Sequence, residues 1–188
     1  MEDMNRVLSM ERATKFLSLR KILSTRIALG VSLCLVCIVP AFVLFDGQHC
    51  GVFGISEDTA ISMGLLTIVL MLLAAVFLFV HSGMILVQNN RIVNEPVTAE
   101  NGVALRIREE SLDLAPAHRK QLGWGIILCV LSPLPLIAII LLQDHPDFSL
   151  TLGMAALLIL VASGAFLIVR TVMISSGYKR LLKACQKK

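Results

Sequence analysis

Two ionisable residues that stand at the ends of long apolar runs are the first candidates for chemistry. His81 follows the run 60–80 and Arg170 follows the run 149–169, so both occupy the same place relative to their runs. An ionisable side chain within a membrane is costly and is usually functional. An arginine at the very end of a span, however, often only extends its charged group to the membrane surface. The pair is therefore predicted either to bind a lipid headgroup or cytoplasmic ligand, or to mark the membrane boundary.

Cys34 and Cys37 form a C-x-x-C motif, the arrangement that carries a reactive thiol pair in redox proteins. Such a pair needs a polar, accessible setting that lowers the thiol pKa, whereas here the neighbours are Leu, Val and Ile. Small buried side chains are the favoured interpretation, and a membrane thiol-redox protein is the weakest function considered. The chain has 5 Cys, an odd number that fits no disulfide framework.

Side chains of metal-ligand type gather in two short segments between apolar runs. They are Asp46, His49, Cys50, Asp144, His145 and Asp147. Their spacing matches no familiar metal site, and solvated acids are the ordinary explanation. The sequence contains no glycine-rich phosphate loop and no nucleophile motif. It therefore predicts no catalytic residue, no metal and no cofactor, and the chain is not expected to be an enzyme.

The elements that carry these residues follow from composition. The chain has 188 residues, of which 56% are hydrophobic and only 16% charged, against about 25% charged in soluble domains. Crossing the ~30 Å hydrocarbon core takes about 20 apolar residues in a helix, and four runs are long enough: 27–45, 60–80 continuing to 87, 123–142 and 149–169. Because backbone polar groups must be satisfied inside the bilayer, each run is predicted to be a helix.

The basic residues predict the orientation of these four helices. All 17 Lys and Arg lie before the first run, between the second and third, or after the fourth, while the other two connections carry only acidic charges. Cationic segments stay in the cytoplasm, so the protein is predicted to lie in the cell membrane with both termini cytoplasmic. The leader before the first run is long for a signal peptide and no cleavage site follows the run, so a retained helix is expected.

The two halves of the chain resemble each other. At an offset of 95 residues, Gly30, Cys34 and Pro40 fall on Gly125, Cys129 and Pro135; at an offset of 89, Gly64, Phe77 and Met84 fall on Gly153, Phe166 and Met173. The pattern predicts an all-α polytopic membrane protein built as two tandem helical hairpins, a parallel internal repeat. The matched prolines should kink the first and third helices near their outer ends.

Small residues four positions apart let membrane helices approach closely. The predicted packing residues are Gly30, Cys34, Gly64, Gly125, Cys129 and Gly153. They either pack the hairpins together or make a homo-oligomer.

This scheme divides the chain into five segments. They are a basic amphipathic N-terminal segment (1–26) expected to lie in the membrane interface, a first hairpin (27–87), a cytoplasmic loop (88–122), a second hairpin (123–174) and a basic cytoplasmic tail (175–188). Pro96, Gly102 and Pro116 limit the loop to a short helix, expected over 104–114. Neither the first segment nor the loop is long enough to bury a core of its own.

Several segments resemble a known family. Arg26-Ile-Ala-Leu-Gly-Val-Ser-Leu-Cys-Leu, Gly125-Ile-Ile-Leu-Cys-Val-Leu-Ser-Pro-Leu-Pro135, Phe166-Leu-Ile-Val-Arg170 and Tyr178-Lys-Arg-Leu-Leu182 are similar to the membrane region of bacterial membrane-anchored helix-turn-helix regulators of the Xre type. Only 26 residues precede the first run, so the resemblance implies a stand-alone membrane module without the DNA-binding domain and without direct nucleic-acid contact.

The leading functional hypothesis is a non-enzymatic sensor, anchor or regulatory membrane module. Its partners would be the lipid bilayer and a cytoplasmic regulatory protein, with a homo-oligomer as a further option. The alternative is a small permease or export component.

Overall fold

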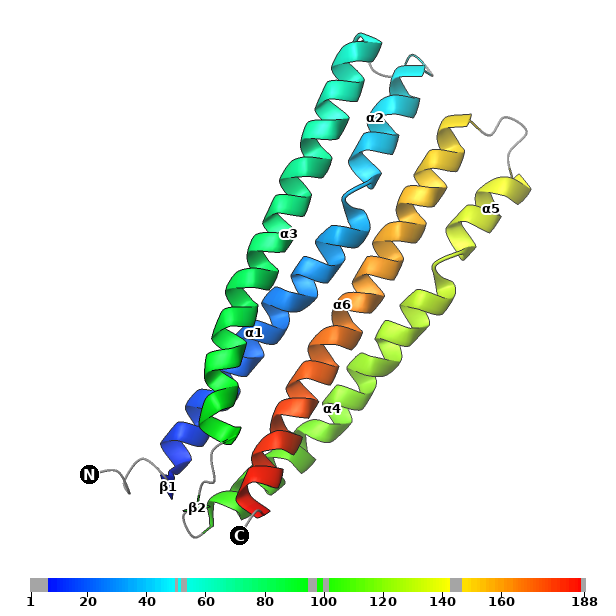
Figure 1. Cartoon of the computed structure of the whole chain (residues 1–188). Helices are drawn as coiled ribbons and strands as arrows, with labels where there is room; N and C mark the ends of the chain where they lie inside the picture. Colours follow the sequence, from blue (N-terminus) through cyan, green and yellow to red (C-terminus); the bar gives the residue numbers. More distant parts are fainter. Residues whose placement is uncertain are drawn as a thin grey trace.

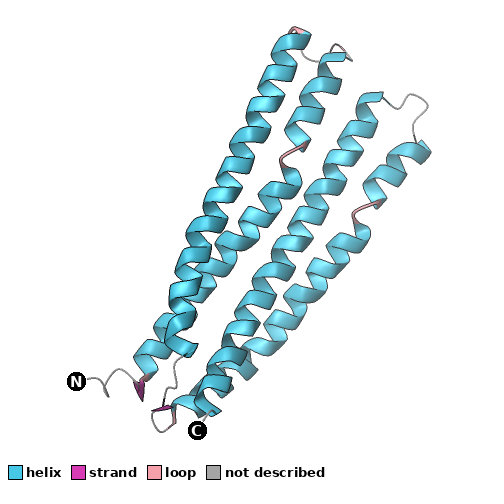
Figure 2. Ribbon diagram, in the orientation of Figure 1, coloured by secondary structure: helices cyan, strands magenta, loops and turns pink. Residues whose placement is uncertain are grey.

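The computed structural model describes residues 7–49, 51, 54–94, 98–99, 102–142 and 147–186, which form an all-α structure (Figures 1 and 2). The helices are α1 (Met10–Val36), α2 (Val39–His49), α3 (Glu57–Asn94), α4 (Val103–Leu131), α5 (Leu134–Leu142) and α6 (Asp147–Gln186). Two short strands, β1 (Val7–Leu8) and β2 (Thr98–Ala99), pair in parallel. This pairing joins the segment before α1 to the connection between α3 and α4.

Four helical segments are long and apolar enough to cross a membrane: α1 with α2, α3, α4 with α5, and α6. Large apolar side chains along them are exposed, and on α3 Leu73 and Phe77 are 61% and 68% exposed. Soluble proteins rarely expose apolar surface on this scale, whereas a lipid-facing helix must. The chain is a multi-pass membrane protein whose four candidate spans contact the bilayer.

The spans follow one another across the molecule in the order α3, α1 with α2, α6, and α4 with α5 (Figure 1). The α1 helix packs against α3 on one side and against α6 on the other, while α4 packs on the far side of α6. This order leaves α3 and α4 at opposite ends of the row. The two hairpins therefore meet mainly where α1 runs beside α6.

The helices extend well beyond the predicted spans at one end of the molecule. The 40 residues of α6 are ~60 Å long at 1.5 Å per residue, twice the ~30 Å hydrocarbon core. Basic residues mark this end, whereas Glu57 and Asp58 begin α3 at the other. The end holding residues 10–26, 88–94, 103–122 and 170–186 is called the helical head below.

The head corrects the sequence-based picture of short, separate soluble segments. Residues 10–26 continue directly into the first span within α1, and residues 170–186 belong to α6. The short helix expected over 104–114 is wrong, because α4 runs unbroken from Val103 to Leu131 through Pro116. The proline ring removes one backbone bond, to Leu112, and both residues lie on the exposed face of α4, where water can satisfy the freed carbonyl.

Both helices expected to kink at a proline are broken there. The α1 helix ends at Val36, four residues before Pro40, and α4 ends at Leu131, four residues before Pro135. Proline has no N–H to donate to the carbonyl four residues earlier, and its ring clashes with that carbonyl. The helix therefore stops and restarts, as α2 and α5, with proline in its first turn, where no donor is needed.

Glycines on the first and third spans pack closely against the neighbouring helix of their own hairpin. A Cβ added at Gly30 on α1 would lie 3.2 Å from the ring of Phe79 on α3. A Cβ at Gly125 on α4 would lie 2.9 Å from Ile168 and 3.0 Å from the carbonyl oxygen of Gly164, both on α6. Helix backbones approach closely at both places because no side chain separates them.

Glycines on the second and fourth spans make the corresponding contacts nearer the outer ends. A Cβ at Gly64 on α3 would lie 3.2 Å from Cα of Ala41 on α2, and one at Gly153 on α6 would lie 3.3 Å from Cα of Leu136 on α5. The four matched glycines thus all face a helix of their own hairpin. The two hairpins contact each other through other residues, including the Ser32 hydroxyl, which donates to the Ala162 carbonyl at 3.0 Å.

The close approach of α6 to α4 at Gly164 gives a direct test of this packing. A Cβ at Gly164 would lie 2.7 Å from the Gly125 carbonyl oxygen and against the Cys129 sulfur, so Gly164→Ala should lower stability by about 1–3 kcal/mol through overpacking. A Cβ at Gly123 meets nothing within 4 Å, so Gly123→Ala should be neutral or stabilise by up to about 1 kcal/mol. Unfolding midpoints of the purified protein in detergent measure both; equal midpoints would contradict the packing described here.

Candidate functional site in the helical head

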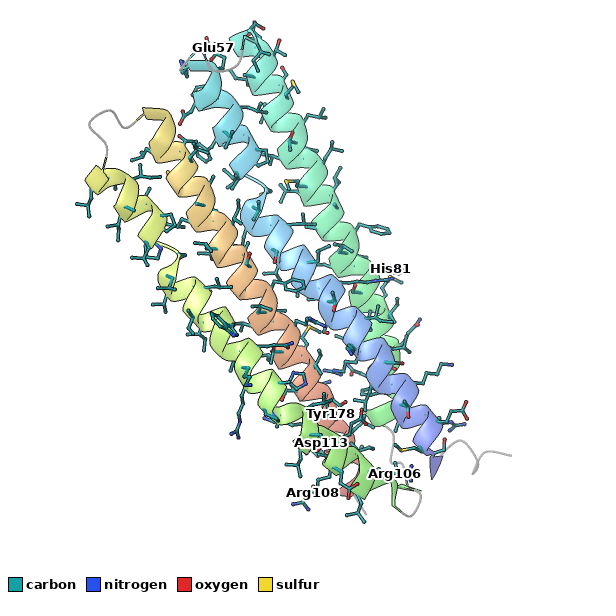
Figure 3. The ribbon with its side chains drawn as sticks, turned by 180° about the vertical axis from the view of Figure 1, so that it is seen from behind. Glu57, His81, Arg106, Arg108, Asp113 and Tyr178 are labelled. Carbon is teal, nitrogen blue, oxygen red and sulfur yellow. The ribbon has the colours of Figure 1, made fainter. Side chains whose placement is uncertain are left out.

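The head contains the most completely buried side-chain cluster among the described residues. It joins three helices and consists of Ala13 and Phe16 from α1, Val103 and Ile107 from α4, and Ile174, Tyr178 and Leu181 from α6. Figure 3 shows Tyr178 at this end of the molecule with Arg106, Arg108 and Asp113, and Glu57 at the opposite end. The head is thus a packed helical structure rather than a set of loops.

A buried arginine lies at the centre of the head. Arg20 on α1 is only 4% exposed. Its Nη1 donates to Asn90 Oδ1 on α3 at 3.1 Å, and its Nε donates to the Met173 carbonyl on α6, also at 3.1 Å. Its Nη2 donates to Ser176 Oγ on α6 at 2.9 Å. One guanidinium therefore holds three helices, which come from both hairpins.

The surroundings of Arg20 are shaped to admit it. A Cβ at Gly177 would collide with the Arg20 side chain and lie 2.7 Å from its Nε, so only glycine leaves room there. The guanidinium carbon also lies 5.8 Å from the ring centroid of Phe16, within cation–π range. The neighbouring Asn89, 4% exposed, donates from Nδ2 to the Phe16 carbonyl at 3.5 Å. Together these contacts fix α1 against α3 and α6.

A cavity of about 400 Å³ lies on another side of α1, between α1, α4 and α6. At the end nearest the spans it is lined by Lys21 from α1, His118 and Gln121 from α4, and Arg170 from α6. At the far end the Tyr178 hydroxyl donates to Glu110 Oε1 at 3.1 Å. This part of the head therefore combines cationic and hydrogen-bonding groups from three helices.

Several polar atoms at the cationic end are buried without a partner. Both ring nitrogens of His118 and Nε of Arg170 have no hydrogen-bond partner among the described residues. Buried polar atoms almost always have one, so each exception calls for an explanation such as a bound ion or water. Burial, followed by the nearby charges of Arg170 and Lys21, lowers the pKa of His118 below its usual value near 6.5.

At the far end of the cavity the polar groups of Tyr178 and Glu110 are paired with each other. Burial, and then the Glu110 carboxylate, raise the pKa of Tyr178 to about 12. The phenol therefore stays protonated at any physiological pH and continues to donate to Glu110. A second cavity of about 520 Å³ lies across the α4–α6 seam, where Arg119 and Lys179 accompany His118.

The structure separates the two residues that the sequence paired. Arg170 lines the cavity on α6, whereas His81 is exposed on α3 at the edge of the row (Figure 3), stacked on Phe77 with ring centroids 5.8 Å apart. The expected pair therefore does not form one site. The residues that line the cavity with Arg170 are Lys21 and His118, which nothing in the sequence distinguishes.

The remaining chemical candidates show no assembled site among the described residues. Cys37 is buried and donates its thiol to the Cys34 carbonyl at 3.1 Å. Cys129 is half-buried with its sulfur 4.0 Å from the Val161 carbonyl. Within the described ranges no three His, Cys, Asp or Glu side chains are placed to hold a metal ion. Cys50, Asp144 and His145 lie outside those ranges.

Comparison with models of known protein families, with characterised proteins and with solved structures finds no match to this chain.

Arg20 is predicted to be a main stabilising residue of the head. Arg20→Gln removes the hydrogen bonds that the guanidinium donates to Asn90, Ser176 and the Met173 carbonyl, so the free energy of unfolding should fall by about 1–3 kcal/mol. Arg26→Gln removes a charge from the exposed side of the same helix and should change it by less than about 0.5 kcal/mol. Thermal unfolding in detergent measures both, and an Arg20→Gln variant as stable as the Arg26→Gln variant would rule out this role.

The ring of His118 should titrate below its usual pKa. Arg170→Gln should raise that pKa, because of the two nearby positive charges Arg170 lowers it more than Lys21 does. NMR titration of the His ring resonances tests this, with His118→Gln to assign the signal among the 4 His of the chain. Arg119→Gln, on the neighbouring residue, is the matched control. A His118 pKa that does not respond to the Arg170 substitution contradicts the described arrangement.

Proposed function

We propose that the protein is a non-enzymatic sensor, anchor or regulatory membrane module that acts through its helical head in the cytoplasm. The observation that carries this proposal is the place of the buried core. The cluster around Ile107, Tyr178 and Leu181 lies beyond the spans, where water can drive apolar burial. A packed structure in this position can contact proteins in the aqueous phase, which the spans themselves cannot do.

The charge distribution supports a cytoplasmic head. The Lys and Arg residues fall at the head end of all four spans, and the acids Asp46, Glu57 and Asp58 stand at the other end. Cationic segments are retained in the cytoplasm. The proposal therefore places both termini and the α3–α4 connection inside the cell.

Contacts of the glycines support two copies of one hairpin. Gly30 with Phe79 corresponds to Gly125 with Ile168 when the offsets of 95 and 89 residues are applied to the two members. Gly64 with Ala41 corresponds in the same way to Gly153 with Leu136. The helix breaks also match, since α1 and α4 end 95 residues apart. Chance similarity between apolar sequences does not require equivalent contacts.

The alternatives receive less support. The helices lie in a row with α3 and α4 at its ends rather than in a closed ring, so a permease built on this arrangement would need several copies to surround a pathway. A redox protein would need an accessible thiolate, whereas the thiol of Cys37 is buried and donates to a carbonyl.

The outer face of α4 is the proposed docking surface for a cytoplasmic protein. Leu105 and Leu112, seven residues apart on one side of the helix, are 65% and 62% exposed. Exposed charges lie between them at Arg108 and Glu109. Apolar residues at this spacing, bordered by charges, are typical of a helix that pairs with another helix. The resemblance to the membrane region of Xre-type regulators favours a regulatory protein as the partner.

Photo-crosslinking in intact cells tests this function. A photoreactive residue at position 109 should form an adduct with one cytoplasmic protein, identified by mass spectrometry, and Leu105→Ser with Leu112→Ser should abolish it. The same probe at position 77, on the lipid-facing side of α3, serves as the matched control and should yield no such adduct. An adduct only with a second copy of this chain, or one that survives the double substitution, would contradict the proposal.

A further inference from the structure

The cavity between α1, α4 and α6 is divided by chemistry along its length. Near the spans its lining residues Lys21, His118, Gln121 and Arg170 can all donate hydrogen bonds. The middle is apolar, with Leu17, Leu114 and Ile174. The cationic end lies within a few residues of the predicted spans, which begin at residues 27 and 123 and end at residue 169.

The unpartnered atoms at this end define what is missing. Nε of Arg170 is a donor under all conditions, and even a neutral His118 ring donates from one of its two nitrogens. The missing partner must therefore be an acceptor. Because three side chains from three helices would share it, it needs several acceptor atoms in different directions.

The acidic group of the cavity does not supply that acceptor. Glu110 lies eight residues from His118 on α4, or ~12 Å along the helix axis. Its carboxylate already accepts from Tyr178 at the far end. Lys21 and Arg170 are close enough to lower the pKa of His118, and Glu110 does not neutralise their positive charges.

We propose that the cationic end of this cavity binds a phosphate group, with Arg170, Lys21 and His118 as the anion-binding residues and Gln121 as a neutral donor. Phosphate carries up to two charges and offers acceptor oxygens in a tetrahedral arrangement, which suits donors arriving from three helices better than a planar carboxylate does. Arginine and lysine are the usual phosphate-binding side chains. The phosphate belongs either to an anionic lipid headgroup of the adjacent leaflet or to a soluble phosphate compound.

The phosphate site would give the proposed membrane module a ligand. This inference rests on the proposed function in one respect only, the location of the site at the cytoplasmic surface of the membrane. A bound phosphate joins α4, at one end of the row, to α1, which otherwise meets it mainly through the buried cluster. Because the exposed leucines of the docking surface lie on the same α4 helix, the ligand and the partner would act on one element.

Two binding measurements on the purified full-length chain test the site and separate its two sources. Native mass spectrometry compares retention of phosphatidic acid with retention of phosphatidylcholine. NMR of the His118 ring follows titration with glycerol phosphate, with malonate as the carboxylate comparison. Preference for phosphatidic acid alone identifies a headgroup site, response to glycerol phosphate alone identifies a soluble ligand, and either result supports the proposal.

Substitutions then assign the binding residues. Arg170→Gln and Lys21→Gln should each weaken binding by about tenfold, the loss of one charge-assisted hydrogen bond. Arg26→Gln on α1 and Lys120→Gln on α4 remove charges of exposed side chains that do not line the cavity, and each should change the affinity by less than about twofold. Arg170→Lys, which keeps the charge and the fold, should bind with intermediate affinity.

Three results would overturn the phosphate site. They are the absence of binding to either probe in the unsubstituted protein, a response to malonate equal to that for glycerol phosphate, and equal weakening by the control substitutions. The photo-crosslinking experiment does not depend on either probe, so failure of the phosphate site and failure of the proposed docking function are distinguished.

Discussion

Burial of the Arg20 guanidinium constrains the whole head. A cation taken out of water is costly unless its donors are satisfied. The acceptors of its three hydrogen bonds come from other helices: Asn90 on α3, and Ser176 and Met173 on α6. All three lie beyond the apolar spans. The α3 and α6 helices must therefore continue past their apolar spans and stay beside α1, which requires the long unbroken helices that the structure shows.

The spans and the head are held together by different forces. Inside a bilayer, lipid tails are as apolar as leucine, so helices associate through close packing and hydrogen bonds. The glycine contacts of Gly30 and Gly125 and the Ser32 bond to Ala162 serve that role. In the head, water restores the hydrophobic effect, and each fully buried Leu, Ile or Phe contributes about 1.5–3 kcal/mol. Ile107 and Leu181, both 0% exposed, are the clearest cases.

The sequence predicted the structural features that depend on long apolar runs or on single residues. Four apolar stretches indicated the four spans. Pro40 and Pro135 predicted kinks where the structure has helix breaks, and the positions agree because a missing N–H acts locally. The sequence did not indicate how far the helical head extends, because few apolar residues mark the buried side of α4. Val103, Ile107 and Leu114 recur at helical spacing, but the charges between them and the Pro116 that follows are typical of a loop. Only packing against α1 and α6 makes that stripe a stable helix.

The candidate site was less accessible to sequence reasoning for a related reason. Arg170 was singled out because it interrupts an apolar run, while Arg20 and Lys21 stand in a leader that contains six basic residues. Nothing in a basic leader distinguishes the buried cation from the solvated ones. That difference arises from Asn90 and Ser176, which are 70 and 156 residues away from Arg20 in the chain. Such a long-range match of donor and acceptors cannot be read from local spacing.

The adjacent positions of Arg20 and Lys21 link the fixed and the open parts of the head. Consecutive helical residues point about 100° apart, so one turn of α1 presents Arg20 to α3 and α6 and Lys21 to the cavity beside α4. The Arg20 contacts hold α1 in place whether or not the cavity is filled. A ligand bound at Lys21 would therefore act on α4, whose place is set mainly by α6. Coupling between ligand and partner then requires only that α4 has two positions with different affinities for the ligand.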